Sequence, residues 1–217
     1  MKRTAILFDM DGLMVDTEPL SRASWDRVLA PHGVVIADDL YARMLGRRTT
    51  ESVVMVLETH SLPWTAEDLI ARKTAAFMAL LREDIPAMPG LWVLLDELER
   101  RDIPWGVATS SPRLIAETVL RGLSLEDRCR TLVAGDQVER GKPAPDIYLL
   151  AAERMGVDPA ACLALEDSEP GCLSAAAAGM RVAAVTAELP PGESFDCACR
   201  RYFTLAEVAA DLDDLLA

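Results

Sequence analysis

Histidine and paired cysteine are scarce in this chain of 217 residues, and that scarcity excludes several kinds of site. There are two histidines and five cysteines, and no Cys-x-x-Cys pair occurs. A zinc site or a Ser-His-Asp triad therefore has few residues to build on. An odd set of cysteines without paired spacing indicates reduced thiols, so we expect a cytoplasmic protein.

Long apolar runs and an excess of positive charge are also absent. No apolar run approaches the roughly 20 residues that span a bilayer. The short run near the N-terminus ends at Asp9, too early for a secretory signal. The formal net charge is -13, and so acidic a chain repels a phosphate backbone. We therefore expect neither a membrane nor a nucleic acid as partner, and we expect a monomer.

The apolar pattern changes twice along the chain. Residues 4–8 form a continuous apolar run, typical of a strand buried on both faces. Residues 17–85 show helical periodicity without a convincing strand, and Thr65 followed by Glu67 and Asp68 predicts a capped helix start. After Pro89-Gly90, strand and helix patterns alternate. The alternation predicts strands over 103–108, 131–134, 162–165 and 181–185, with helices over 91–101, 112–121, 145–155 and 170–178.

Alternating strands and helices predict a parallel sheet covered on both faces. The expected fold class is therefore α/β, with a Rossmann-like core and an inserted α-helical cap domain. The core comprises residues 1–15 and 87–217, and the cap comprises residues 16–86. Because ligands bind at the carboxyl ends of parallel strands, a cap inserted there can cover the site.

Polar clusters follow four of the predicted strands. These clusters are Asp9-Met10-Asp11, Thr109-Ser110-Ser111, Gly141-Lys142-Pro143 and Glu166-Asp167-Ser168. Each cluster alone is more typical of a turn or of a helix N-cap. Their common position at strand ends, in this order, predicts that they form one site.

The residue types in these clusters suit phosphoryl transfer. Asp9 and Asp167 are hard oxygen ligands of the kind that Mg²⁺ prefers. A carboxylate such as Asp9 can act as a covalent nucleophile, and a second carboxylate such as Asp11 can protonate the leaving oxygen and later activate water. Lys142, the Thr109 hydroxyl and the Ser110 amide can bind phosphate oxygens.

Four segments resemble the four motifs of the haloacid dehalogenase superfamily, in the β-phosphoglucomutase-like, subfamily IA phosphatase branch. The match spans nearly the whole chain, and the helical insertion is similar to the cap of that branch. The four segments are Phe8-Asp9-Met10-Asp11-Gly12-Leu13-Met14-Val15-Asp16-Thr17-Glu18, Ala108-Thr109-Ser110-Ser111, Gly141-Lys142-Pro143-Ala144-Pro145-Asp146, and Glu166-Asp167-Ser168 with Gly171.

The resemblance implies a role for each of these residues. Asp9 is expected to be the nucleophile and a metal ligand, and Asp11 the general acid and base, with its carbonyl also on magnesium. Asp167 is expected to ligate Mg²⁺, and Glu166 to do so directly or through water. The remaining residues, Thr109, Ser110 and Lys142, are expected to hold the phosphate.

The expected activity is hydrolysis of a small phosphate ester, of the sugar phosphate class, through an aspartyl-phosphate. A β-phosphoglucomutase-like mutase is the alternative, although Ser21 stands where the mutases carry a histidine and Leu45-Gly46-Arg47-Arg48-Thr49 departs from their cap pattern. The acids Asp11, Glu166 and Asp167 argue against a metal-free dehalogenase. From another class, a phospho-Asp switch remains open, and so do substrate roles for Arg47, Arg48 and Glu18.

Overall fold

The computed structural model describes residues 4–44, 49–187, 192 and 194–216. The chain forms two compact units. One unit, here the core unit, consists of residues 1–16 and 85–217, and the other, the helical unit, consists of Thr17–Asp84. Each unit is built around its own set of buried apolar side chains.

The core unit contains a six-stranded parallel sheet in the order β3-β2-β1-β4-β5-β6. The first strand in sequence lies near the middle of the sheet, so its neighbours β2 and β4 come from distant parts of the chain. Chain order reverses between β1 and β4, which is the position where parallel sheets bind ligands. The strands are β1 (Ala5–Phe8), β2 (Trp105–Ala108), β3 (Leu132–Val133), β4 (Cys162–Glu166), β5 (Arg181–Val185) and β6 (Arg200–Tyr202).

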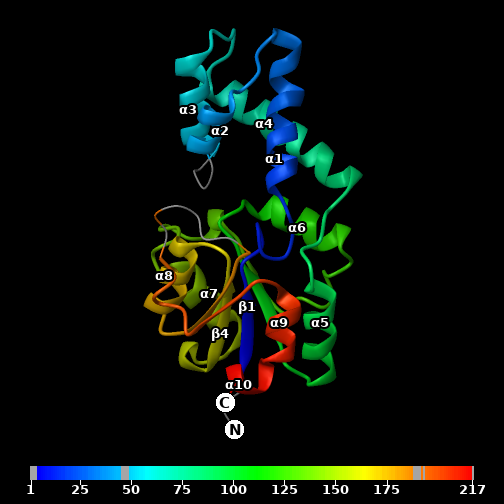
Figure 1. The fold of residues 1–217 in the computed structure, drawn as a ribbon, viewed down its shortest axis with the longest axis vertical. Coiled ribbons are helices and arrows are strands. Elements are labelled where there is room, and N and C mark those ends of the chain that lie inside the picture. Colours follow the sequence, from blue (N-terminus) through cyan, green and yellow to red (C-terminus); the bar gives the residue numbers. More distant parts are fainter. Residues whose placement is uncertain (1–3, 45–48, 188–191, 193, 217) are drawn as a thin grey trace. The chain divides into compact units, whose positions relative to one another are not determined.

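Helices cover both faces of this sheet, which is why its inner strands are largely apolar. On one face, α7 (Asp146–Met155) and α8 (Glu169–Ala177) bury alternate residues of β1, β4 and β5. In Figure 1, α5 (Leu91–Arg100) and α9 (Leu205–Ala210) lie on the other side of β1. The remaining helices of this unit are α6 (Arg113–Gly122), α10 (Leu212–Leu216) and the short 3-10 turns η2 (Gly135–Gln137) and η3 (Pro159–Ala161).

The helical unit has its own core, in which Trp25, Leu29, Val53 and Leu69 are buried. Thr65 begins its longest helix, because its hydroxyl accepts from the Asp68 amide while the Asp68 carboxylate accepts from the Thr65 amide. The predicted start of that helix is therefore confirmed. The helices are α1 (Glu18–Leu29), η1 (Ala30–His32), α2 (Asp38–Met44), α3 (Thr49–Thr59) and α4 (Ala66–Glu83).

The sheet confirms the predicted α/β class, with one strand more than the sequence pattern indicated. That strand, β6, has the sequence Arg-Arg-Tyr, and both arginines are exposed. An edge strand pairs on one side only and need not be apolar, so it leaves little periodicity in the sequence. Among the residues that the structure describes, no helix combines the length and apolar character needed to cross a bilayer.

Candidate active site

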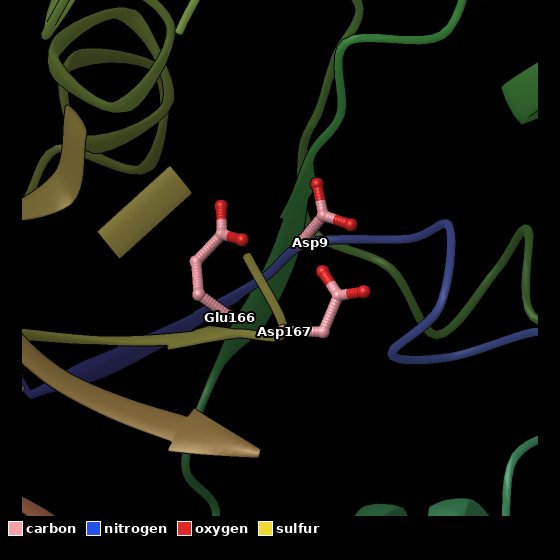
Figure 2. A group of neighbouring side chains, drawn as sticks. All are labelled: Asp9, Glu166 and Asp167. Atoms are coloured by element: carbon pink, nitrogen blue, oxygen red, sulfur yellow. The ribbon is translucent and has the colours of Figure 1, made fainter. Parts of the chain in front are cut away.

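Three carboxylates gather at the carboxyl ends of the two central strands. Asp9 follows β1, Glu166 ends β4, and Asp167 comes next. The pairing of Phe8 with Leu165 sets Asp9 beside Glu166, and the Asp9 amide donates to the Leu165 carbonyl at 3.0 Å. One oxygen from each carboxylate lies within 4.8 Å of the other two (Figure 2). Strand register therefore assembles the acidic cluster, defined here as Asp9, Glu166 and Asp167.

Lys142 reaches this cluster from the loop before α7. Its Nζ donates to Asp9 Oδ1 and, at 2.6 Å, to Glu166 Oε1. The Lys142 side chain is 6% exposed and that of Glu166 is 0% exposed, so this ion pair is shielded from water. Three carboxylates and one ammonium group share a buried space, which leaves an excess of negative charge.

A tight turn links Asp9 to the chain that leaves the sheet. The Met14 amide donates to the Met10 carbonyl at 2.9 Å, and the Gly12 amide donates to the Val15 carbonyl at 2.9 Å. Gly12 has a φ of 83°, in the left-handed region that favours glycine. A Cβ atom added to Gly12 would lie 2.1 Å from Asp167 Oδ2. Glycine is thus required both by the backbone of the turn and by its approach to the cluster.

The start of α8 fixes the opposite side of the cluster. Ser168 caps this helix, because its Oγ accepts from the Gly171 amide at 3.3 Å. The same hydroxyl donates to Glu166 Oε2 at 3.3 Å. A Cβ atom on Gly171 would stand 2.0 Å from Glu166 Oε2, so this glycine makes room for the buried carboxylate.

Asp11 is bound by hydroxyl groups from the loop after β2. Its Oδ2 accepts from Ser111 Oγ at 2.8 Å and from Thr109 Oγ1 at 3.2 Å. Thr109 Oγ1 in turn accepts from the Ser111 amide at 3.0 Å. Ser110 is exposed, and its carbonyl would lie 2.2 Å from a Cβ atom on Gly135. Close packing of η2 thus supports the loop that carries these hydroxyl groups.

Burial dominates the electrostatics of the acidic cluster, while Lys142 and the neighbouring carboxylates act in opposite directions. Burial raises the pKa of Asp9 well above its ordinary value, Lys142 opposes the rise, and Glu166, Asp167 and Asp11 add to it. Burial and Glu166 raise the pKa of Asp167 to about 7, against the opposing effect of Lys142. Burial lowers the pKa of Lys142, but Asp9 and Glu166 outweigh this and hold it above its usual range.

These features fit a divalent cation. All three donors are carboxylate oxygens, the ligands that Mg²⁺ prefers. One lysine balances only part of their charge, and a cation would favour the ionised forms that burial disfavours. The small residues Gly12 and Gly171 keep space beside Asp167 and Glu166.

The structure gathers the residues that the sequence singled out in the core unit into two contact groups, except for Ser110, which is exposed in the loop after β2. Lys142 joins Asp9, Glu166 and Asp167, while Asp11 joins Thr109. Glu18 lies at the start of α1 in the helical unit. Arg47 and Arg48 lie outside the described residues.

Among the described residues, three further side chains donate hydrogen bonds to the carboxylates of this site without having been assigned a role from the sequence. They are Ser111, which donates to Asp11, Ser168, which donates to Glu166, and Tyr148, whose hydroxyl donates to Glu166 Oε1 at 2.6 Å. Ser111 and Ser168 lie within the motif segments, so their position in the sequence could have indicated that they contact the site. Tyr148 lies on the apolar face of a helix, where the pattern indicates only a core residue.

Comparison with known proteins identifies the family. Residues 4–179 match the model of the haloacid dehalogenase-like hydrolases. This match covers more than half of the chain, and the chain belongs to that family. The resemblance carried by the four motifs is confirmed.

Relatives and solved structures give the same family. The chain is 35% identical to the phosphorylated carbohydrates phosphatase of Thermotoga maritima, covering 88% of each protein. It is 35% identical to the fructose-1-phosphate phosphatase YqaB of Escherichia coli, covering 81% of this chain and 92% of that one. A putative β-phosphoglucomutase from Thermotoga maritima superposes with a TM-score of 0.85 at 31% identity, covering 98% of this chain and 100% of the other.

Proposed function

We propose that this protein is a magnesium-dependent phosphomonoesterase that hydrolyses a small phosphorylated sugar through an aspartyl-phosphate on Asp9. The observation that carries the proposal is the contact of the Lys142 ammonium group with Asp9, beside Glu166 and Asp167, at the topological switch point of the sheet. It sets a carboxylate nucleophile beside a buried positive charge and a set of cation ligands.

The substrate class is supported by the relatives. Two proteins that share 35% identity with this chain are named as phosphatases of phosphorylated carbohydrates and of fructose 1-phosphate. The substrate of this chain is inferred from these relatives. The proposal therefore names the class of sugar phosphates and no particular sugar.

Asp9, Asp167 and Glu166 would hold the cation, with the Asp11 carbonyl as a further ligand. Hydrolases of this family generally use Mg²⁺. When bound, the ion would offset negative charge on the phosphoryl oxygens and on the carboxylates. Lys142 would bind a phosphoryl oxygen from the side of Asp9, and the Thr109 hydroxyl and the Ser110 amide would bind others.

In the first step an Asp9 oxygen attacks phosphorus, and the bond from phosphorus to the ester oxygen breaks. Asp11 gives its proton to the departing alcohol. In the second step water attacks the phosphorus of the aspartyl-phosphate, and Asp11 takes a proton from that water. The acyl phosphate bond breaks, inorganic phosphate leaves, and Asp9 is restored. The Ser111 contact holds Asp11 during both proton transfers, because the single proton of the Thr109 hydroxyl goes to the phosphoryl group once substrate is bound.

The proposal also assigns the helical unit the role of the cap expected from the sequence. The proposal further states that the protein is cytoplasmic and monomeric and binds no nucleic acid. The acidic charge and the free cysteines support this part. A phosphosugar mutase is the second candidate, because a putative β-phosphoglucomutase has the same fold at 31% identity.

The test is phosphate release from a panel of sugar phosphates and nucleotides, with Mg²⁺ and with EDTA, for the wild type and for Asp9→Asn. We expect Mg²⁺-dependent release from sugar phosphates, lowered by roughly 10³-fold or more in the variant. Wild-type rates in Asp9→Asn, with deamidation excluded by mass spectrometry, would refute the nucleophile. Interconversion of sugar phosphates without net release would favour the mutase.

A further inference from the structure

Tyr148 makes the closest hydroxyl contact with the acidic cluster among the described residues, although it belongs to the apolar core. It lies on α7, six residues after Lys142, and is fully buried. Its hydroxyl donates to Glu166 Oε1 at 2.6 Å, and Lys142 Nζ donates to the same oxygen at 2.6 Å. Lys142 Nζ also lies 5.2 Å from the centre of the Tyr148 ring, within the range of a cation–π contact. One side chain therefore touches both the carboxylate and the ammonium group.

The hydroxyl is unnecessary for packing. Tyr148 lies in a cluster of buried residues with Ile147, Ala151 and Ala152, and a phenylalanine would fill the same space. Burying a hydroxyl group costs free energy unless it finds a partner. Its partner here is a carboxylate, and hydrogen bonds to a charged group are among the stronger ones. The position of the hydroxyl is therefore explained by Glu166 and not by the core.

The contacts of Glu166 divide between its two oxygens. Oε1 accepts from Tyr148 and Lys142, while Oε2 has Ser168 Oγ at the longer distance of 3.3 Å. Two short contacts on one oxygen fix the rotation of the carboxylate about its axis. Groups that orient a metal ligand in this way commonly change metal affinity by 10- to 100-fold when they are removed.

We propose that Tyr148 is a positioning residue for the cation site. Its hydroxyl orients the Glu166 carboxylate, and its ring supports the Lys142 ammonium group. It acts through these two groups. The inference rests on the proposed function only in assigning the acidic cluster to a divalent cation.

Two substitutions separate the two parts of this role. Tyr148→Phe removes the hydroxyl and keeps the ring, whereas Tyr148→Leu removes both. We expect Tyr148→Phe to weaken Mg²⁺ binding roughly tenfold. At saturating Mg²⁺ it should leave inhibition by inorganic phosphate within about twofold of wild type, because the ring still supports Lys142. Tyr148→Leu should weaken both Mg²⁺ binding and inhibition by inorganic phosphate.

The matched control is Tyr202→Phe. Tyr202 lies on β6, is 8% exposed, and donates to the Asp211 carboxylate outside the acidic cluster. This variant therefore also loses a contact between a phenol and a carboxylate. It should bind Mg²⁺ like the wild type.

The experiment is calorimetric titration of metal-free protein with Mg²⁺ in the absence of substrate, with thermal unfolding in EDTA to verify folding. A Kd for Tyr148→Phe within twofold of wild type would overturn the inference, as would equal weakening in Tyr202→Phe. Because Tyr148→Phe keeps the core filled, it remains informative even where Tyr148→Leu does not fold. Weaker Mg²⁺ binding in Tyr148→Phe, together with a wild type that releases no phosphate, would support the inference while refuting the proposed function.

Discussion

Gly12 packs directly against the carboxylate of Asp167, so that a Cβ atom on Gly12 would stand 2.1 Å from Asp167 Oδ2. Gly12 belongs to the turn after β1, and Asp167 follows β4. The turn and the acidic cluster are therefore built together. A side chain at Gly12 must displace either the turn or a proposed metal ligand.

Gly12→Ala is accordingly predicted to damage the cation site more than the fold. The positive φ at this position costs an alanine about 1 to 2 kcal/mol. The Cβ atom of that alanine also displaces Asp167. We expect Mg²⁺ affinity and kcat/KM to fall at least about tenfold. The control is Gly156→Ala, which has a φ of 66° but nothing within 4 Å of the added Cβ atom. Equal effects of the two variants on Mg²⁺ affinity would contradict this prediction.

Lys142→Met is predicted to destabilise the metal-free protein, since it leaves Asp9 and Glu166 buried without their positive partner. Removal of one member of a buried ion pair costs about 3 to 5 kcal/mol. The loss should be larger at pH 8 than at pH 5, because protonated carboxylates need no partner. Mg²⁺ should restore part of it. Denaturant unfolding in EDTA at both pH values measures the effect.

The matched control for that variant is Arg140→Met. Arg140 pairs with Asp146 in the same segment, but its side chain is 69% exposed. Exposed ion pairs contribute little to stability, so this variant should unfold like the wild type. If Lys142→Met also unfolded like the wild type in EDTA, the buried pair would not be a stabilising contact.

The sequence alone predicts the sheet well because buried parallel strands are apolar and end in polar residues. Asp9, Thr109 and Asp167 were found in this way. The edge strand Arg200–Tyr202 was missed because an exposed edge carries no such run. Tyr148 was missed for a different reason. Helical periodicity indicates that a residue is buried, but only the folded chain shows that its hydroxyl meets Glu166, 18 residues away.

Mg²⁺ binding is predicted to depend on pH through Asp167. Burial and the neighbouring Glu166 raise its pKa to about 7 in the metal-free protein. Below that pH the carboxyl group is mostly protonated and must lose its proton to bind the cation, so affinity should rise with pH through about 7, and the raised pKa of Asp9 should extend this rise. Calorimetry at pH 6 in buffers of different ionisation enthalpy should show proton release.

The control for the pH dependence is Asp167→Asn, which cannot release that proton. It should bind Mg²⁺ more weakly and with fewer protons released at pH 6. In the metal-free wild type, the free energy of unfolding should fall as the pH rises from about 4 towards 7. Over this pH range only the folded state keeps the Asp167 carboxyl group protonated. A flat Mg²⁺ affinity from pH 5.5 to 8.5 would refute the assignment.

Ser111→Ala is predicted to slow turnover by loosening Asp11. The variant removes the 2.8 Å contact to Asp11 Oδ2 and leaves the 3.2 Å contact from Thr109. We expect kcat to fall about tenfold, less than the 10²- to 10⁴-fold that general acid–base catalysis contributes, while Asp11→Asn should lose most of that contribution. The control is Thr118→Ala. It removes an exposed hydroxyl on α6 whose only described hydrogen bond goes to the Leu114 carbonyl. Leaving groups of low pKa, such as p-nitrophenol, need little protonation, so Ser111→Ala and Asp11→Asn should each lose less in phosphorylation with p-nitrophenyl phosphate than with a sugar phosphate. An equal loss with the two substrates in rapid-quench measurements of the first step would show that Asp11 does not protonate the leaving group.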